Sequence, residues 1–335
     1  MSKVTLLDYK LTIGEKIKYI HDRLSLESIP LEELSGVVFS ETLEAQYRMM
    51  RDHLNKNTIQ KRFFNQSLKN RELLNTYYSH AYTHNHVAFE DEVFEALDAV
   101  NGLSDVSETP ERVKLKKLLV LEELIDVYHF LLEYSCLLKE HTLMQIECAK
   151  YGERKKDFTV ADLERFLTLD DNFGVEYYEG RKYNVFDFLR LEGKHVSYDI
   201  FSKEFPLNLR SIPSNCSGKQ ALFYLFQLNR EFVRNCNFKD WKTYSEDFYD
   251  AVKFAGLNNV VRKMYYVFMR VFSSYVHFVN VLYTNGVRFA KSNYADSLQV
   301  IYGIYMAKRE ENIRRQRSDP RYTGESSGEV VGVDV

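Results

Sequence analysis

Proline and glycine are scarce in this chain, whose 335 residues include only five Pro and 14 Gly. Both residues interrupt regular backbone, so a chain with few of them makes few sharp turns. Strand patterns are scarce as well, except in the central region. The composition and the helical spacing of the apolar residues predict an all-α helical bundle with an inserted mixed subdomain.

Cysteine is also infrequent, and its four copies show no CxxC spacing (Cys136, Cys148, Cys216 and Cys236). Scattered cysteines of this kind indicate reduced thiols. The chain lacks a run of about 18 uninterrupted apolar residues, and its first residues do not resemble a signal peptide. We therefore expect a soluble, cytoplasmic protein that does not enter a membrane.

An excess of one charge is lacking too, because 45 Lys and Arg oppose 48 Asp and Glu, for a formal net charge of −3. This balance gives no general attraction to nucleic acid or to an anionic membrane, and we expect neither as a partner. Hydrophobic residues make up 45% of the chain, enough for a substantial core. The pattern divides the chain into an N-terminal extension (1–40), the first part of a helical core (41–147), an inserted subdomain (148–244), the remainder of the core (245–317) and a flexible tail (318–335).

Two acidic segments are the most informative part of the sequence. Residues 90–100 read EDEVFEALDAV, and residues 118–133 read LLVLEELIDVYHFLLE. Glu92, Glu95 and Asp98 recur every three residues in the first segment, as Glu123 and Asp126 do in the second, so each set lies along one side of a helix. A short turn at residues 102–110 predicts that the two helices are antiparallel neighbours, with their carboxylates facing one space.

Carboxylates gathered in an apolar setting repel one another unless a cation neutralises them. Ligation by oxygen alone favours Mg²⁺ or Mn²⁺ over zinc. The alternative is that these residues form the solvated face of an amphipathic helix. Dense apolar residues around Glu123 leave little helix circumference for water, which favours a cation site.

The two motifs, ExxExxD and then ExxDxxHF, resemble the signature of the dimeric all-α dUTPases, within the all-α (MazG-like) nucleoside triphosphate pyrophosphatase superfamily. Two further blocks follow that family in order and spacing. Residues 302–322 resemble its late motif, and residues 50–58 (MRDHLNKNT) resemble its early one. The matching residues are Glu92, Glu95, Asp98, Glu123, Asp126, His129 and Phe130, then Lys308, Asn312, Arg315 and Gln316, and Leu54 and Asn55.

The resemblance implies metal-dependent hydrolysis of a deoxyribonucleoside triphosphate to the monophosphate and pyrophosphate, with dUTP the first expected substrate and dCTP the next. Mg²⁺, or Mn²⁺ in its place, would be held by four carboxylates, those of Glu92, Glu95, Glu123 and Asp126. One of these, Glu95 first and Glu92 second, would orient or deprotonate the attacking water. The residues expected to bind substrate are Asn55 at the base or sugar, Asp98, and Lys308, Asn312 and Arg315 at the phosphates.

The chain departs from the family pattern at two places. Arg51 stands where the family has a base-reading Gln, so either a different base edge is read or Arg51 simply lies on a solvated face. The family's Ser-Pro-Trp-Lys stretch is absent after Asp98. Trp241 and Lys242 would have to fold back to replace it, and a structural Trp is the more common outcome.

Other segments bear on architecture. Residues 175–178 predict a small hairpin, and residues 58–90, with His80, His84 and His86, are expected to form a loop near the nucleotide. The helical pattern from Ser40, the helix at 218–233, the aromatic stripe at 260–282 and the helix at 294–316 complete the prediction. In the resembled family such a stripe would also serve a homodimer.

The alternative to an enzyme is a protein of another functional class, a non-catalytic helical scaffold that binds partners.

Overall fold

The computed structural model describes residues 31–68, 70–104, 109–151, 175–178, 181–184, 218–236, 244–245, 248–276 and 293–318. Seven α-helices account for most of these residues: α2 (Leu31–Lys56), α3 (Thr58–Ser67), α4 (Arg71–Asn101), α5 (Pro110–Tyr151), α9 (Gly218–Cys236), α10 (Ala251–Val276) and α11 (Asn293–Ser318). A single 3-10 turn, η2 (Gly102–Ser104), follows α4. The all-α fold expected from the composition is confirmed. Among the described residues, no helix combines the length and apolar character needed to cross a lipid bilayer.

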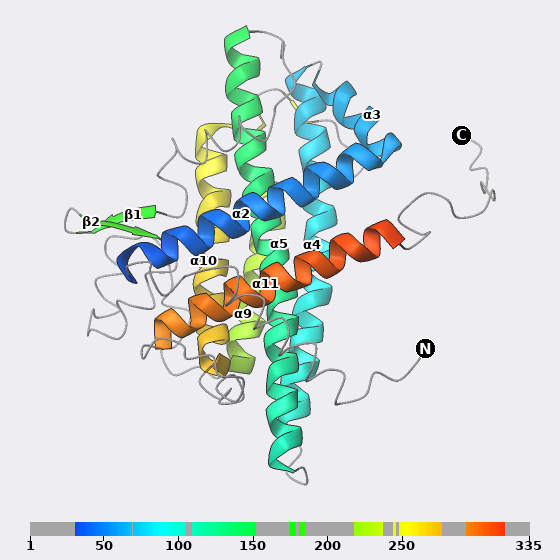
Figure 1. Cartoon of the computed structure of the whole chain (residues 1–335). Coiled ribbons are helices and arrows are strands. Elements are labelled where there is room, and N and C mark those ends of the chain that lie inside the picture. The colour runs from blue at the N-terminus through cyan, green and yellow to red at the C-terminus, as the bar shows by residue number, and fades with distance from the viewer. Residues whose placement is uncertain are drawn as a thin grey trace.

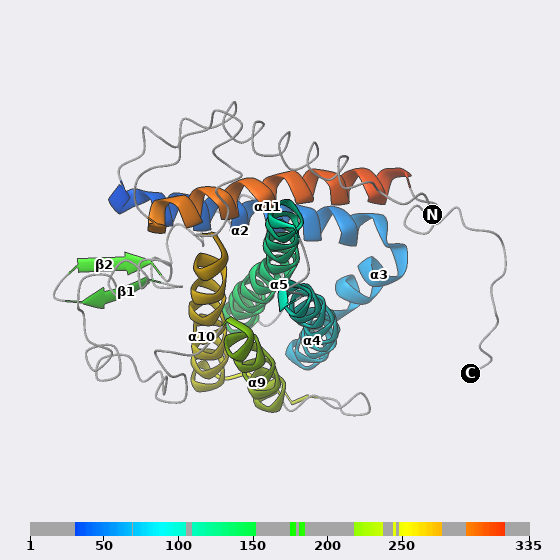
Figure 2. The same ribbon diagram turned by 90° about the horizontal axis from the view of Figure 1, so that it is seen from below.

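The helices form two layers. α4, α5, α9 and α10 stand side by side, and α2 and α11 lie across them on one side (Figures 1 and 2). α4 and α5 are antiparallel neighbours, as the sequence predicts. η2 begins the connection between them, and residues 105–108 lie outside the described residues. Pro110 begins α5, where its missing N–H leaves no helical hydrogen bond unmade.

Side chains of four helices meet around Tyr128 of α5. Its ring stacks on Phe268 of α10, with centroids 5.2 Å apart, and meets the edge of Tyr305 of α11 at 5.7 Å. Its hydroxyl forms a 2.8 Å hydrogen bond with Thr42 of α2. All four side chains are fully buried, so these contacts hold α2 and α11 against α5 and α10.

Two expectations about helix boundaries are wrong. Residues 58–90 are not a loop, because α3 and most of α4 occupy them, each with an Asn cap: Asn57 accepts from the Gln60 N–H and Asn70 from the Leu73 N–H. The helical pattern expected from Ser40 begins earlier, since α2 begins at Leu31. Ser40 is therefore a helix-interior residue with an exposed side chain, and the expected N-terminal extension overlaps α2.

The described parts of the central region are two paired strands and one helix. Residues 175–178 form β1 (Val175–Tyr178), which pairs antiparallel with β2 (Arg181–Asn184), as the hairpin pattern predicts. α9 lies in the same interval, yet it packs in the bundle, where Phe232 meets Tyr134 of α5 at 4.4 Å. The interval 148–244, expected to form an inserted subdomain, thus contains a helix that packs in the core. Trp241 and Lys242 lie outside the described residues.

Candidate metal centre

Three carboxylates of α4 and α5 converge where the two helices run side by side. One oxygen each from Glu92, Glu123 and Asp126 lies within 4.8 Å of the others. Ligands on opposite sides of one Mg²⁺ are roughly 4.2 Å apart, so small side-chain movements would let the three oxygens share a cation. All three side chains are partly buried. The pair of acidic helices predicted from the sequence therefore brings these carboxylates into one space.

Electrostatics show how closely the carboxylates interact. Burial raises the pKa of Glu92 to about 7, and the neighbouring Asp126 and Glu95 add to the rise. The pKa of Glu123 is also raised, first by burial, while Lys308 opposes the shift. A side-chain hydrogen bond with Glu95 contributes to the rise at Glu123, which places the fourth carboxylate beside the cluster. Glu95 itself is exposed.

Lys308 reaches the cluster from α11. Its Nζ forms an ion pair with Asp126 and donates to the Glu122 carbonyl oxygen at 3.2 Å. Burial lowers the pKa of Lys308, but the attraction of Asp126 and their hydrogen bond raise it overall. One cation therefore stands among four acidic side chains, and the cluster keeps a net negative charge when all of them are ionised.

A buried histidine, His129, lies one turn beyond Asp126 on α5. His129 Nδ1 lies 3.0 Å from Gln46 Oε1 of α2, which also accepts from the Tyr305 hydroxyl at 3.1 Å. Burial, and then the charges of Lys308 and Arg309, lower the pKa of His129 to about 3, so the ring is neutral. The bond to Gln46 assigns the proton to Nδ1. The motif at residues 123–130 contains His129, but no local pattern pointed to Gln46 or Tyr305.

The other expected site residues lie on α4, α11 and α2. Asp98 is exposed, one helical turn beyond Glu95, and Asn312 is half-buried, one turn beyond Lys308. Arg315 belongs to α11, but its side chain is outside the described set. Asn55 is exposed in the last turn of α2, nine residues beyond Gln46, a displacement of roughly 14 Å along the helix. Asn55 and the Gln46 that bonds to His129 thus lie at different levels of α2.

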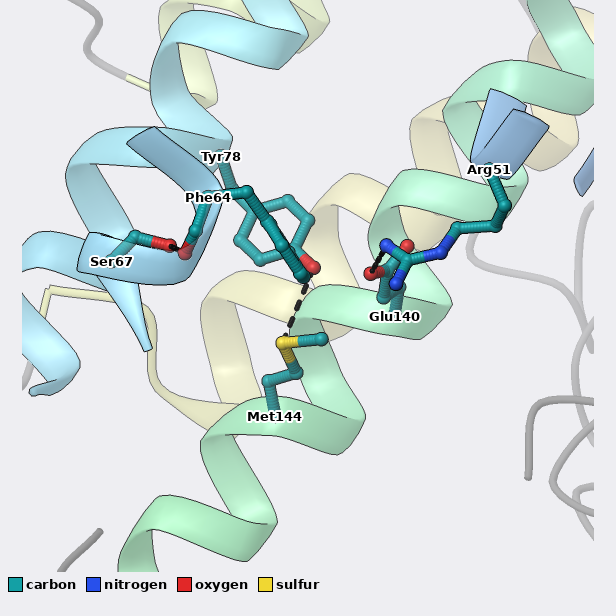
Figure 3. A network of polar contacts seen from close by, with 6 residues as sticks. All are labelled: Arg51, Phe64, Ser67, Tyr78, Glu140 and Met144. Atoms are coloured by element: carbon teal, nitrogen blue, oxygen red, sulfur yellow. Dashed lines mark hydrogen bonds and ion pairs between the residues drawn. The ribbon is translucent and has the colours of Figure 1, made fainter. Parts of the chain in front are cut away.

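Arg51 does not lie on a solvated face. Its Nη1 lies 3.0 Å from Glu140 Oε1, and its guanidinium stands 4.9 Å from the centre of the Phe64 ring (Figure 3). The side chain is only 17% exposed, so it is not on a solvated face. Arg51 instead connects α2 to α5, near the end of the helices where Tyr78 contacts Met144.

The histidines of α4 do not form a metal site with the three converging carboxylates. His84 and His86 are two residues apart on a helix and point in different directions, so the three histidines do not share one face. Within the part of the chain that the structure describes, the three carboxylates are the one group found with metal-ligand spacing.

Comparisons with protein-family models, with curated proteins and with solved structures give no match. The resemblance to the all-α dUTPases therefore rests on the four sequence blocks.

Proposed function

We propose that this protein is a metal-dependent nucleoside triphosphate pyrophosphohydrolase, with dUTP as its first expected substrate and dCTP as the next. The observation that carries the proposal is the convergence of Glu92, Glu123 and Asp126 from two antiparallel helices. Such a cluster is costly without counter-charge, and oxygen ligands suit Mg²⁺ or Mn²⁺. The products would be a nucleoside monophosphate and pyrophosphate.

The four carboxylates divide into two roles. Glu92, Glu123 and Asp126, with Glu95 beside them, would hold the cations. Bound Mg²⁺ lowers the pKa of water and stabilises charge on phosphoryl oxygens. Glu95 is exposed and hydrogen-bonded to Glu123, so it can reach a water molecule and take its proton; Glu92 is the second choice.

The substrate would extend from the carboxylates along α11 and α2. Lys308 supplies a positive charge next to the cluster, and Asn312 and Arg315 follow on the same helix at spacings of four and three residues. These groups would bind the phosphates. Asp98 would contact the substrate from α4, and Asn55 would face the base or sugar at the far end of α2. A homodimer, a triphosphate substrate and a cytoplasmic location belong to the same proposal.

A non-catalytic scaffold is the second candidate, and the ion pair between Lys308 and Asp126 favours it. A lysine inside an acidic cluster neutralises part of its charge without a metal. Lys308 also acts on Glu92 and Glu123, but one lysine does not balance the charge of four carboxylates, which is why the enzyme is the better-supported reading.

The test is pyrophosphate release from a panel of deoxy- and ribonucleoside triphosphates with Mg²⁺. We expect turnover of dUTP or dCTP by the wild type and its loss in Glu123→Gln. Glu41→Gln, which changes an exposed glutamate of α2, is the matched control and should retain activity. A folded wild-type protein that cleaves none of the nucleotides would exclude the enzyme and leave the scaffold.

A further inference from the structure

α3 buries only some of its apolar side chains. Phe64 is buried against the bundle, whereas Ile59 is 80% exposed and Phe63 is 37% exposed. Ile59 and Phe63 are four residues apart, so they lie on one side of the helix. Apolar side chains that are exposed together on one helix are typical of an interaction surface.

The chain around α3 is basic, although the whole molecule has a formal net charge of −3. Residues 53–71 include no Asp or Glu, and they carry five Lys and Arg residues (Lys56, Lys61, Arg62, Lys69 and Arg71). Lys56, Lys61 and Arg62 are exposed. The exposed apolar side chains of α3 therefore lie in a positive field, which favours an acidic partner that also has apolar side chains.

The chain that follows α11 has the complementary composition. Residues 322–335 read YTGESSGEVVGVDV. They include three acidic residues (Glu325, Glu329 and Asp334), four valines and no Lys, Arg or His. Residues 319–335 lie outside the described residues, and their composition is that of a ligand for α3.

The fold brings the end of α11 towards α3. Tyr305 of α11 donates to Gln46 of α2 at 3.1 Å, and the two helices run in the same direction (Figures 1 and 2). Beyond this contact α2 continues for ten residues and α11 for thirteen, about 15 Å and 20 Å. α3 follows α2 after a single residue. Seven extended residues span about 23 Å, more than the roughly 10 Å between packed helices, so Glu325 can reach α3.

We infer that residues 322–335 bind to α3 of the same chain, with their valines against Ile59 and Phe63 and their carboxylates beside the exposed cations. A segment tethered this close has an effective concentration of about 1 mM, so a contact with a lower dissociation constant is mostly formed. A separate polyanion, such as nucleic acid or an anionic lipid surface, would have to approach a molecule of net negative charge. The tethered segment is therefore the occupant that composition and position favour, and the inference does not rest on the proposed chemistry.

The experiment places a photoreactive benzophenone amino acid at position 59 of the full chain. Irradiation joins its ring to the group that lies against it, and digestion followed by mass spectrometry identifies the captured peptide. We expect capture of residues 322–335. The same probe in place of Phe223 is the matched control and should not capture them. Phe223 is 51% exposed on α9, one turn beyond Lys219, which bonds to Asn101 at the far end of α4.

Isotope labelling and charge reversal test the two remaining parts of the inference. In an equal mixture with isotope-labelled wild type, the captured peptide should be unlabelled, because it belongs to the same chain as the probe. Arg62→Glu sets like charges together and should lower the yield severalfold. Arg234→Glu changes an exposed arginine of α9 and should leave the yield unchanged. Circular dichroism establishes that each variant keeps its helical content.

Four outcomes would overturn the inference. The probe at position 59 could capture no peptide from residues 322–335, capture labelled and unlabelled copies alike, or capture lipid or nucleic acid instead. The fourth is a yield that Arg62→Glu does not change.

Discussion

The protonation of Glu92 controls how strongly the carboxylate cluster can bind a cation. Its pKa is about 7, and a carboxylic acid must lose its proton before it ligates a metal. Affinity for Mn²⁺ should therefore rise with pH, by about tenfold between pH 6 and pH 8. Titration calorimetry of Mn²⁺ into the nucleotide-free protein at three pH values measures this dependence.

Glu92→Gln is the control for this prediction, since an amide does not titrate. Its Mn²⁺ affinity should be weaker than that of the wild type at pH 8 and should depend less on pH, with the remaining dependence coming from Glu123, whose pKa is also raised. A wild-type dissociation constant that stays level from pH 6 to pH 8 would show that Glu92 does not ligate the ion.

At the residue scale, the sequence predicted the carboxylates but not what surrounds them. Glu92, Glu123 and Asp126 were predictable because three-residue spacing puts them on one side of each helix. Gln46 and Tyr305 were not, because their contacts with each other and with His129 join segments far apart in the chain. The contact of Arg51 was missed for the same reason, since its partner Glu140 lies 89 residues away.

Between elements, the pair of Arg51 and Glu140 holds α2 against α5. Glu140 is only 5% exposed, and removing its partner would leave part of its charge unbalanced. We expect Arg51→Met to lower the free energy of unfolding by about 3 kcal/mol. Urea denaturation followed by circular dichroism gives this value.

The double variant Arg51→Met, Glu140→Met separates charge from packing. Two apolar side chains of similar length should recover most of the loss, to within about 1 kcal/mol of the wild type. If the double variant is as unstable as the sum of the two single variants, the pair does not act as a coupled unit.

Helix prediction succeeded where apolar residues follow one face and failed where they do not. The patterns at 218–233 and 294–316 became α9 and α11. The first half of α4 was missed because its polar residues are buried among its neighbours: Asn75, Ser79 and Asn85 are 1% exposed or less. Asn75, for example, bonds to His141 of α5 and to the Ser245 carbonyl oxygen. Polar residues satisfied inside a core make a helix resemble a loop in sequence.

For the whole molecule, a bound cation should stabilise the fold, because its proposed ligands join two helices. A ligand at 100 times its dissociation constant adds about 2.7 kcal/mol to the free energy of unfolding. We expect Mn²⁺ to raise the melting temperature of the wild type by several degrees and that of Glu123→Gln by much less. Differential scanning calorimetry with and without the ion measures both shifts. An equal rise in the two proteins would place the ion elsewhere.

The connection between α4 and α5 has a consequence for how the molecule is made. Both acidic helices come from one hairpin, whereas Lys308 follows Asp126 by 182 residues. A ribosome adding about 5–20 residues per second needs roughly 10 to 40 seconds to reach that lysine. Hairpin contacts are local and form early. The acidic pair of the nascent chain therefore exists before its own lysine has been synthesised, and during that interval dissolved cations are what can balance its charge.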